Sequence, residues 1–183
     1  MSEILCSFIV ITRNDQYGNF THSEIARNIN YLINGLKSSS HKYEIMIVEW
    51  NSDEKNMSLR VALKGAIESS NNVKVRILIA PRSLHKKYLY SDLRPWCGEG
   101  ACNFGIRRAS GKYCLVKAQD SFYSRKLIDW FANGEFDPNI IYRADRVDLN
   151  ERVMLTNLLR LDEETLFSTG QRHDLLREGE LHT

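Results

Sequence analysis

Short runs rich in apolar residues alternate along this chain with segments in which apolar residues recur every three or four positions. The runs lie at residues 5–12, 44–49, 73–80, 113–118 and 139–143. Short apolar-rich runs of this kind are typical of strands that are buried on both faces of a parallel sheet. The pattern therefore predicts five strands.

The segments between these runs predict helices. Thr21 and Glu24 have the spacing of a capping box, which marks a helix start. The apolar positions that follow at helical spacing are Ile25, Ile29, Leu32, Ile33 and Leu36. A second helix is marked by Leu59, Ala62, Leu63, Ala66 and Ile67, a third covers residues 98–110, and a short fourth holds Leu127, Ile128 and Phe131. Residues 82–97 show no period and predict a long loop, and 151–183 form a polar, weakly helical tail.

The regular alternation of strands and helices predicts an α/β fold: one domain with a mainly parallel, twisted, Rossmann-like sheet flanked by helices. The length of 183 residues suits one domain with a full core. Repeats, linkers and low-complexity segments are not found.

Charge and cysteine content narrow the class of protein. A formal net charge of +2 predicts no strong general affinity for nucleic acid or membrane. The apolar runs are too short for a transmembrane segment, and the first residues do not resemble a signal peptide. The four cysteines match no zinc motif, so we expect buried, reduced thiols in a cytoplasmic protein.

Several common nucleotide-binding and catalytic motifs are missing from the sequence. The first strand is followed by TRNDQYGN, which is neither G-x-G-x-x-G nor a Walker motif, and G-x-S-x-G does not occur. This disfavours dehydrogenases, P-loop enzymes and serine hydrolases. A nucleotide would have to be held by side chains at the strand ends.

Polar residues follow three of the predicted strands. Thr12, Arg13 and Asn14 end the first, Glu49 ends the second, and Asp120 lies just beyond the fourth. Any one of these ends could be an ordinary turn. Their coincidence favours a site in the crevice outside the strand ends, where Asp120 could hold a divalent cation and the cation a diphosphate.

Four segments carry a resemblance to a known family: FIVITRND, EIMIVEWNSD, N-x-G-I-R-R-A-S-G-K-Y and A-Q-D-S. Over residues 5–148 the chain resembles the nucleotide-binding part of glycosyltransferase family 2, which has the GT-A fold. The resemblance implies a sugar nucleotide donor, a hydroxyl acceptor (glycan or lipid-linked), and Mn²⁺ or Mg²⁺ held by Asp120. It also implies a nucleotide-binding set of Thr12, Arg13, Asn14, Glu49, Asn103 and Arg107.

The chain departs from the family pattern in its acids. The metal signature reads Ala118-Gln119-Asp120, and Glu-Trp-Asn follows the second strand in place of paired acids. We therefore expect weak metal affinity. The acceptor-binding part and general base expected after this region have no recognisable counterpart. Two other classes stay open: a non-catalytic nucleotide- or sugar-binding module, and a pure interaction domain.

Some residues have a plain structural interpretation beside the functional one. Gly105 and Gly111 suit close helix–sheet packing and a helix C-cap. His85 is interpreted as a surface histidine, and Lys86, Lys87 and Arg94 as phosphate ligands or solvated charges. The charges between residues 143 and 148 indicate either a salt-bridged surface or an acceptor-facing cluster.

Overall fold

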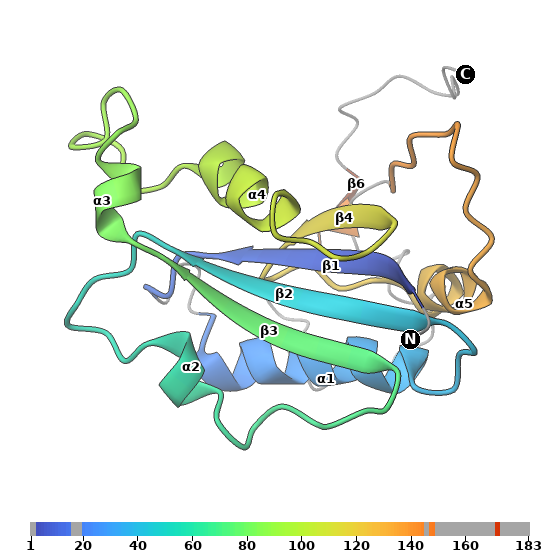
Figure 1. Cartoon of the computed structure of the whole chain (residues 1–183). Coiled ribbons are helices and arrows are strands. Elements are labelled where there is room, and N and C mark those ends of the chain that lie inside the picture. Colours follow the sequence, from blue (N-terminus) through green and yellow to red (C-terminus); the bar gives the residue numbers. More distant parts are fainter. Residues whose placement is uncertain (1–2, 16–19, 145–146, 149–170, 173–183) are drawn as a thin grey trace. The chain divides into compact units, whose positions relative to one another are not determined.

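The computed structural model describes residues 3–15, 20–144, 147–148 and 171–172. The chain divides into two compact units, residues 1–134 and 135–183. The first unit is built on a four-stranded sheet of β1 (Ile4–Thr12), β2 (Lys42–Trp50), β3 (Val73–Ala80) and β4 (Tyr113–Ala118), in the order β3-β2-β1-β4. All three strand pairings are parallel, which confirms the α/β, Rossmann-like fold (Figure 1).

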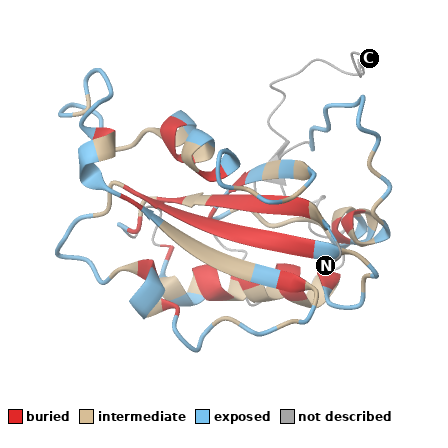
Figure 2. Cartoon of the chain, viewed as in Figure 1, coloured by how far each residue is buried: buried red, intermediate tan, exposed pale blue. Residues whose placement is uncertain are grey.

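The core follows the two central strands. Every residue of β2 except Lys42 is buried, as the continuous apolar run predicts for a strand covered on both faces (Figure 2). The edge strands differ, because β3 is mostly half-buried and β4 alternates between exposed and more buried positions. The two edges therefore carry most of the solvent-facing surface of the sheet.

Helices cover both faces of the sheet. Phe8 packs edge-on against Phe131 of α5 (Arg125–Asn133), which lies beside α1 (His22–Leu36). The next residue, Ile9, faces α4 (Gly98–Ile106) on the other side. Because successive side chains of a strand point to opposite faces, α1 and α5 share one face and α4 covers the other (Figure 1).

The capping box predicted at Thr21 is confirmed, but other boundaries were predicted wrongly. The second helix, α2 (Leu59–Ala62), is one turn long. Bonds of the i→i+3 type follow it, and Gly65 adopts a φ of 77°, which ends helical geometry. The helix predicted over residues 98–110 ends at Ile106, and the predicted loop contains a short helix, α3 (Arg82–His85).

The fifth strand predicted over residues 139–143 is absent. Pro138 sits in a turn, in which Asp137 Oδ1 accepts hydrogen bonds from the backbone and the side-chain nitrogen of Asn139. Turn chemistry thus outweighs the apolar run. The second unit instead pairs β5 (Val147–Asp148) with β6 (Gln171–Arg172) in antiparallel fashion. Residues 145–146 and the rest of the predicted tail at 151–183 lie outside the described residues.

The cysteines only partly match the expected buried thiols. All four are free, but Cys114 is exposed and Cys97 and Cys102 are half-buried. Cys6 is buried, and burial together with the nearby Cys114 raises the pKa of its thiol to about 12. None of the helices in the described part of the chain has the length and apolar character that a membrane crossing requires.

Two glycines allow the segment 98–111 to approach the sheet closely. A Cβ on Gly105 would lie 2.5 Å from Ile9 Cγ2 and 3.0 Å from Val48 Cγ2. A Cβ on Gly111 would lie 2.6 Å from the backbone nitrogen of Ser7. The packing interpretation is confirmed for both, whereas the predicted C-cap is wrong because Arg107 caps α4.

Replacing Gly105 by alanine is expected to lower the free energy of unfolding by up to about 2 kcal/mol. Overpacking against two β-branched core side chains costs about 1–3 kcal/mol, which exceeds the helix propensity of about 1 kcal/mol that alanine adds. Urea denaturation measures the change. Ile9→Ala removes the clashing methyl, so Ile9→Ala/Gly105→Ala should cost less than the sum of the single variants. Additive costs would contradict this packing.

Candidate functional site

The order of the strands singles out one position at the carboxyl edge of the sheet. The chain passes from β1 through α1 to β2 on one side of β1, and β4 lies on the other side. In open α/β sheets ligands bind outside the carboxyl ends of the strands, where the strand order reverses. Here that point lies between residues 12–15 after β1 and residues 118–121 after β4.

A buried hydrogen-bond network lies under this point. Thr12 Oγ1 donates to Gln119 Oε1, which joins the end of β1 to the end of β4. The backbone nitrogen of Asn14 donates to Thr12 Oγ1 over 3.2 Å, and Asn14 Nδ2 donates to Glu49 Oε1 over 2.7 Å. All four side chains are buried. The structure thus brings Thr12, Asn14 and Glu49 together, as their positions at parallel strand ends predict.

Asn14 is the centre of this network. Its φ of 54° lies in the left-handed region, which asparagine tolerates better than most residues. Nδ2 also donates to the carbonyl of Met57, and the carbonyl of Asn14 accepts from Asn56 Nδ2. Its Oδ1 lies 2.7 Å from His22 Nε2, so this ring nitrogen carries a proton and donates. Every polar group of the Asn14 side chain is therefore engaged within the protein.

Glu49 is likewise committed to internal contacts. One carboxylate oxygen accepts from Asn14, and the other accepts from the backbone nitrogen of Leu59 over 2.9 Å at the start of α2. The residue is 1% exposed. Its contacts position the segment after β1 and the start of α2, and they leave neither carboxylate oxygen without a protein donor.

Lys117 extends the buried network on β4. Its Nζ donates to Asn28 Oδ1 over 2.7 Å, and Asn28 Nδ2 donates to the carbonyls of Gln119 and Ser121. Burial lowers the pKa of the Lys117 ammonium to about 7, although the carboxylate of Asp120 opposes the shift. A cationic group that titrates near neutrality therefore lies beside the end of β4.

Three charged side chains lie at the surface near this point. Arg13 forms an ion pair with Asp15 at 2.6 Å, and both side chains are about one third exposed or less. Asp120 is exposed, and its carboxylate forms no hydrogen bond or ion pair with the residues that the structure describes. Asp120 is thus the predicted site residue that is best placed to meet a ligand from solvent.

The two predicted residues on α4 lie apart from this network. Asn103 and Arg107 are exposed, and Arg107 Nε donates to Asn103 Oδ1 over 3.2 Å across one helical turn. No hydrogen bond or ion pair within the described ranges joins either residue to Thr12, Glu49 or Asp120. Their role beside a nucleotide remains a prediction.

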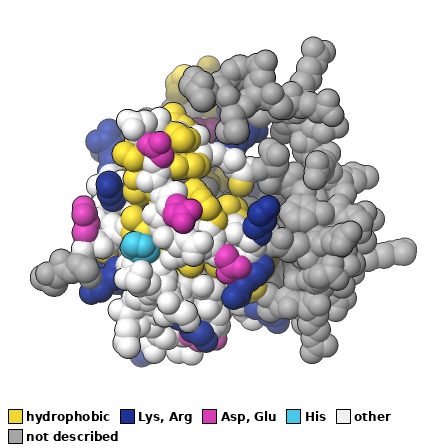
Figure 3. Space-filling view, turned by 90° about the vertical axis from the view of Figure 1, so that its right-hand side faces the viewer, with side chains coloured by type: hydrophobic (Ala, Val, Ile, Leu, Met, Phe, Trp, Pro, Cys, Tyr) yellow, Lys and Arg dark blue, Asp and Glu magenta, His cyan; other side chains and the backbone are white. Residues whose placement is uncertain are grey.

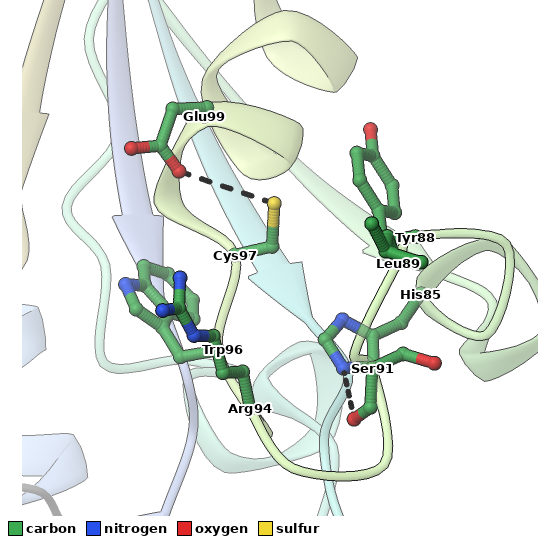
Figure 4. A pocket seen from close by; sticks show the side chains of 8 residues that line it. All are labelled: His85, Tyr88, Leu89, Ser91, Arg94, Trp96, Cys97 and Glu99. Carbon is green, nitrogen blue, oxygen red and sulfur yellow. Dashed lines mark hydrogen bonds between the residues drawn. The ribbon is translucent and has the colours of Figure 1, made fainter.

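A small pocket lies in the segment after β3. Its volume is about 110 Å³, and Figure 4 shows the lining side chains, which come from α3, the following loop and the start of α4. Ligand sites usually measure about 300–1,000 Å³. The pocket can hold a few water molecules but is too small for a nucleotide sugar.

His85, which lines this pocket, is a buried structural residue and not the predicted surface histidine. Trp50 Nε1 donates to His85 Nδ1 over 3.0 Å. Because an indole can only donate, Nδ1 must accept, so the ring is neutral with its proton on Nε2. That nitrogen lies 3.2 Å from the carbonyl of Ser91 and donates to it (Figure 4). His85 therefore ties the loop to the end of β2.

The described residues could hold a metal ion only together with a bound ligand that supplies further metal-binding atoms. Groups of three or more histidine, cysteine, aspartate or glutamate side chains that could hold a metal do not occur among the described residues. Mg²⁺ is commonly bound by one or two carboxylates together with substrate phosphates. The lone, exposed Asp120 suits that arrangement and does not suit a protein cage.

The sequence did not predict three residues of the network: His22, Asn28 and Lys117. Two had a signal, since Asn28 interrupts the apolar stripe of α1 and Lys117 interrupts the apolar run of β4. His22 had none, because its partner Asn14 becomes a neighbour only through the fold.

Comparisons with known proteins add no identification. No protein-family model matches the chain, and a search of curated proteins found no match. The chain is shown to contain an α/β domain with a four-stranded, all-parallel sheet.

Proposed function

We propose that this chain binds a sugar nucleotide as the donor-binding part of a glycosyltransferase resembling family 2. The observation that carries the proposal is the exposed carboxylate of Asp120 at the point where the strand order reverses. The family resemblance in the strand ends supports the same location. Transfer to a hydroxyl acceptor would then release a nucleoside diphosphate.

The contacts suggest how the residues share this task. Asp120 would hold Mn²⁺ or Mg²⁺ together with the diphosphate of the bound donor. The metal would offset the negative charge of the leaving group. Arg13 lies at the same edge and would contact the donor. Thr12, Asn14 and Glu49 act as positioning residues, because their hydrogen bonds hold the ends of β1, β2 and β4 in one arrangement.

A second candidate is a non-catalytic nucleotide- or sugar-binding module. The observation that favours it is the internal commitment of Glu49, whose two carboxylate oxygens accept from Asn14 and Leu59. Such a module would bind its ligand without a metal. The two candidates therefore differ in whether binding depends on a divalent cation.

Asp120→Asn separates the candidates. For the transferase, UDP or GDP with Mn²⁺ should stabilise the wild type by about 2.7 kcal/mol at a hundred times the dissociation constant. The melting temperature would rise by roughly 5–10 °C. We expect Asp120→Asn to weaken binding in Mn²⁺ about tenfold or more, because asparagine lacks the charge that attracts a hard cation. Calorimetric titration with Mn²⁺ and with chelator measures both affinities.

Asp53→Asn is the matched control. Asp53 follows β2 at the same edge of the sheet, and its Oδ1 accepts from the backbone nitrogen of Lys55, a role that asparagine can take over. The affinity of Asp53→Asn for UDP or GDP with Mn²⁺ should match that of the wild type. Equal affinity of the wild type with Mn²⁺ and with chelator would instead support the module. No binding of either nucleotide would reject the transferase and a nucleotide-binding module, and would leave only a sugar-binding module.

A further inference from the structure

The loop at residues 86–94 places four large apolar or aromatic side chains in solvent. Leu89 is 80% exposed, Leu93 79%, Tyr90 62% and Tyr88 37%. The loop follows α3 and extends away from the sheet (Figure 1). Single exposed apolar residues are normal on protein surfaces, but contiguous patches mark interaction sites. Four such residues within six positions of one projecting loop therefore require an explanation.

The flanks of the loop are basic. Arg82, Lys86, Lys87 and Arg94 are exposed, and Asp92 is the one acid between residues 82 and 94. None of these four cations has a side-chain hydrogen bond or ion pair within the described part of the chain. In contrast, the side of the first unit drawn in Figure 3 shows acidic and basic side chains interspersed. The loop thus combines an apolar tip with a local excess of positive charge.

The loop is held in one conformation by its own contacts. The backbone nitrogens of Tyr88, Ser91 and Leu93 donate to the carbonyls three residues before them. Tyr88 packs edge-on against Trp50 with ring centroids 5.7 Å apart. His85 bonds both Trp50 and the carbonyl of Ser91, so the two arms of the loop are joined. Preorganisation of this kind reduces the entropy lost on binding.

Tyr90 at the tip adds a second sign of constraint. Its φ is 61°, a left-handed conformation that bulky residues rarely adopt. Its side chain is 62% exposed, so packing in the core does not explain the conformation. The turns around it keep the tip projecting while the tyrosine side chain stays in solvent.

We propose that the 86–94 loop docks the protein onto an anionic lipid surface. Leu89 and Leu93 would enter the boundary between headgroups and acyl chains, and the tyrosines would lie at headgroup level, as interfacial aromatic residues do. Lys86 and Lys87 would face the anionic headgroups. A narrow projecting tip with unpaired cations fits a deformable, negatively charged surface better than it fits a flat protein interface. The attraction is local, so it is compatible with the small net charge of the whole chain.

Sedimentation of the full chain with vesicles tests the proposal. Vesicles of phosphatidylcholine with about 30% phosphatidylserine provide the anionic surface, and pure phosphatidylcholine is the comparison. We expect the wild type to bind the anionic vesicles. Leu89→Ser/Leu93→Ser should lower the partition coefficient about tenfold or more, because the apolar area that enters the lipid is lost. Lys86→Gln/Lys87→Gln should lower the partition coefficient roughly tenfold on the anionic vesicles and leave it unchanged on pure phosphatidylcholine.

Met57→Ser/Val61→Ser is the matched control. Both residues are 58% exposed and lie outside the loop. This variant should bind as the wild type does. Circular dichroism should show all the variants folded, because none of the replaced side chains belongs to the core.

Three results would overturn the proposal. One is no binding of the wild type to anionic vesicles, and another is equal binding by the wild type and Leu89→Ser/Leu93→Ser. The third is a wild-type dimer, seen by analytical ultracentrifugation without lipid, that the leucine variant abolishes. In that case the patch serves a second copy of the chain.

Discussion

Replacing Glu44 by alanine is expected to lower the free energy of unfolding by about 3 kcal/mol. The carboxylate is fully buried in β2 and accepts from Arg76 at 2.7 Å, from the Ser7 hydroxyl at 2.8 Å and from the backbone nitrogen of Ser110 at 3.0 Å. Removing one partner of a buried ion pair typically costs about 3–5 kcal/mol, and Arg76 can be partly rehydrated. Urea denaturation at neutral pH measures the loss.

The same carboxylate makes stability depend on pH in acid. Burial raises the pKa of Glu44, but the hydrogen bonds from Arg76, Ser110 and Ser7 outweigh burial, so its pKa is lowered overall. A lowered pKa means that the stabilisation is complete above the unfolded value of about 4.3 and is lost as the pH falls through the folded value. The Glu44→Ala variant should lose less stability in this range than the wild type. An exposed-site control, Glu54→Ala, should keep the wild-type slope, and a Glu44→Ala loss under about 1 kcal/mol would contradict the prediction.

Lys117→Met is expected to remove an alkaline rise in stability. The folded pKa of Lys117 is about 7 and its ordinary value is 10.5, so between these values the unfolded chain binds more protons than the folded one. The free energy of unfolding of the wild type should therefore increase with pH by up to about 1.4 kcal/mol per unit above pH 7. With methionine at this position, that contribution disappears.

The measurement is urea denaturation of both proteins between about pH 6 and 9. The difference in free energy of unfolding between the wild type and Lys117→Met should change by roughly 2–3 kcal/mol over this interval. Lys74→Met replaces an exposed lysine of β3 and should keep the wild-type profile. Parallel profiles for wild type and Lys117→Met would show that Lys117 stays charged in the folded protein.

Most of the first unit could be predicted from the hydrophobic pattern, because β1 to β4 are apolar-rich runs, and the fold buries the two central strands, β1 and β2, most completely. The misassigned segments are those in which a local feature outweighs the pattern. Gly65 stops α2 after one turn, and the Asp137 turn replaces the predicted fifth strand. Both features act through backbone conformation, which apolar spacing does not report.

The position of the site was predictable from the sequence, but the exposure and hydrogen bonding of its side chains were not. Parallel strand ends meet at one edge, so the proximity of Thr12, Asn14 and Glu49 followed from the topology. Whether each side chain faces solvent or an internal partner did not follow from the topology. Glu49 accepts hydrogen bonds from Asn14 and from the start of α2, and the periodicity that predicted this helix carries no information on such a contact. Asp120 stays exposed because β4 ends at Ala118 and the chain turns there.

The strand order also predicts an order of events in folding. The Asn14–Glu49 hydrogen bond joins residues 35 positions apart, whereas the Thr12–Gln119 bond spans 107. Closing the longer loop costs about 1 kcal/mol more in chain entropy, and contacts between residues close in sequence form sooner. We therefore expect the sheet to grow from β1, β2 and β3, and β4 to join last. Because Asp120 follows β4, the proposed ligand site would exist only once the sheet is complete, and a nucleotide that bound there would select the fully folded chain.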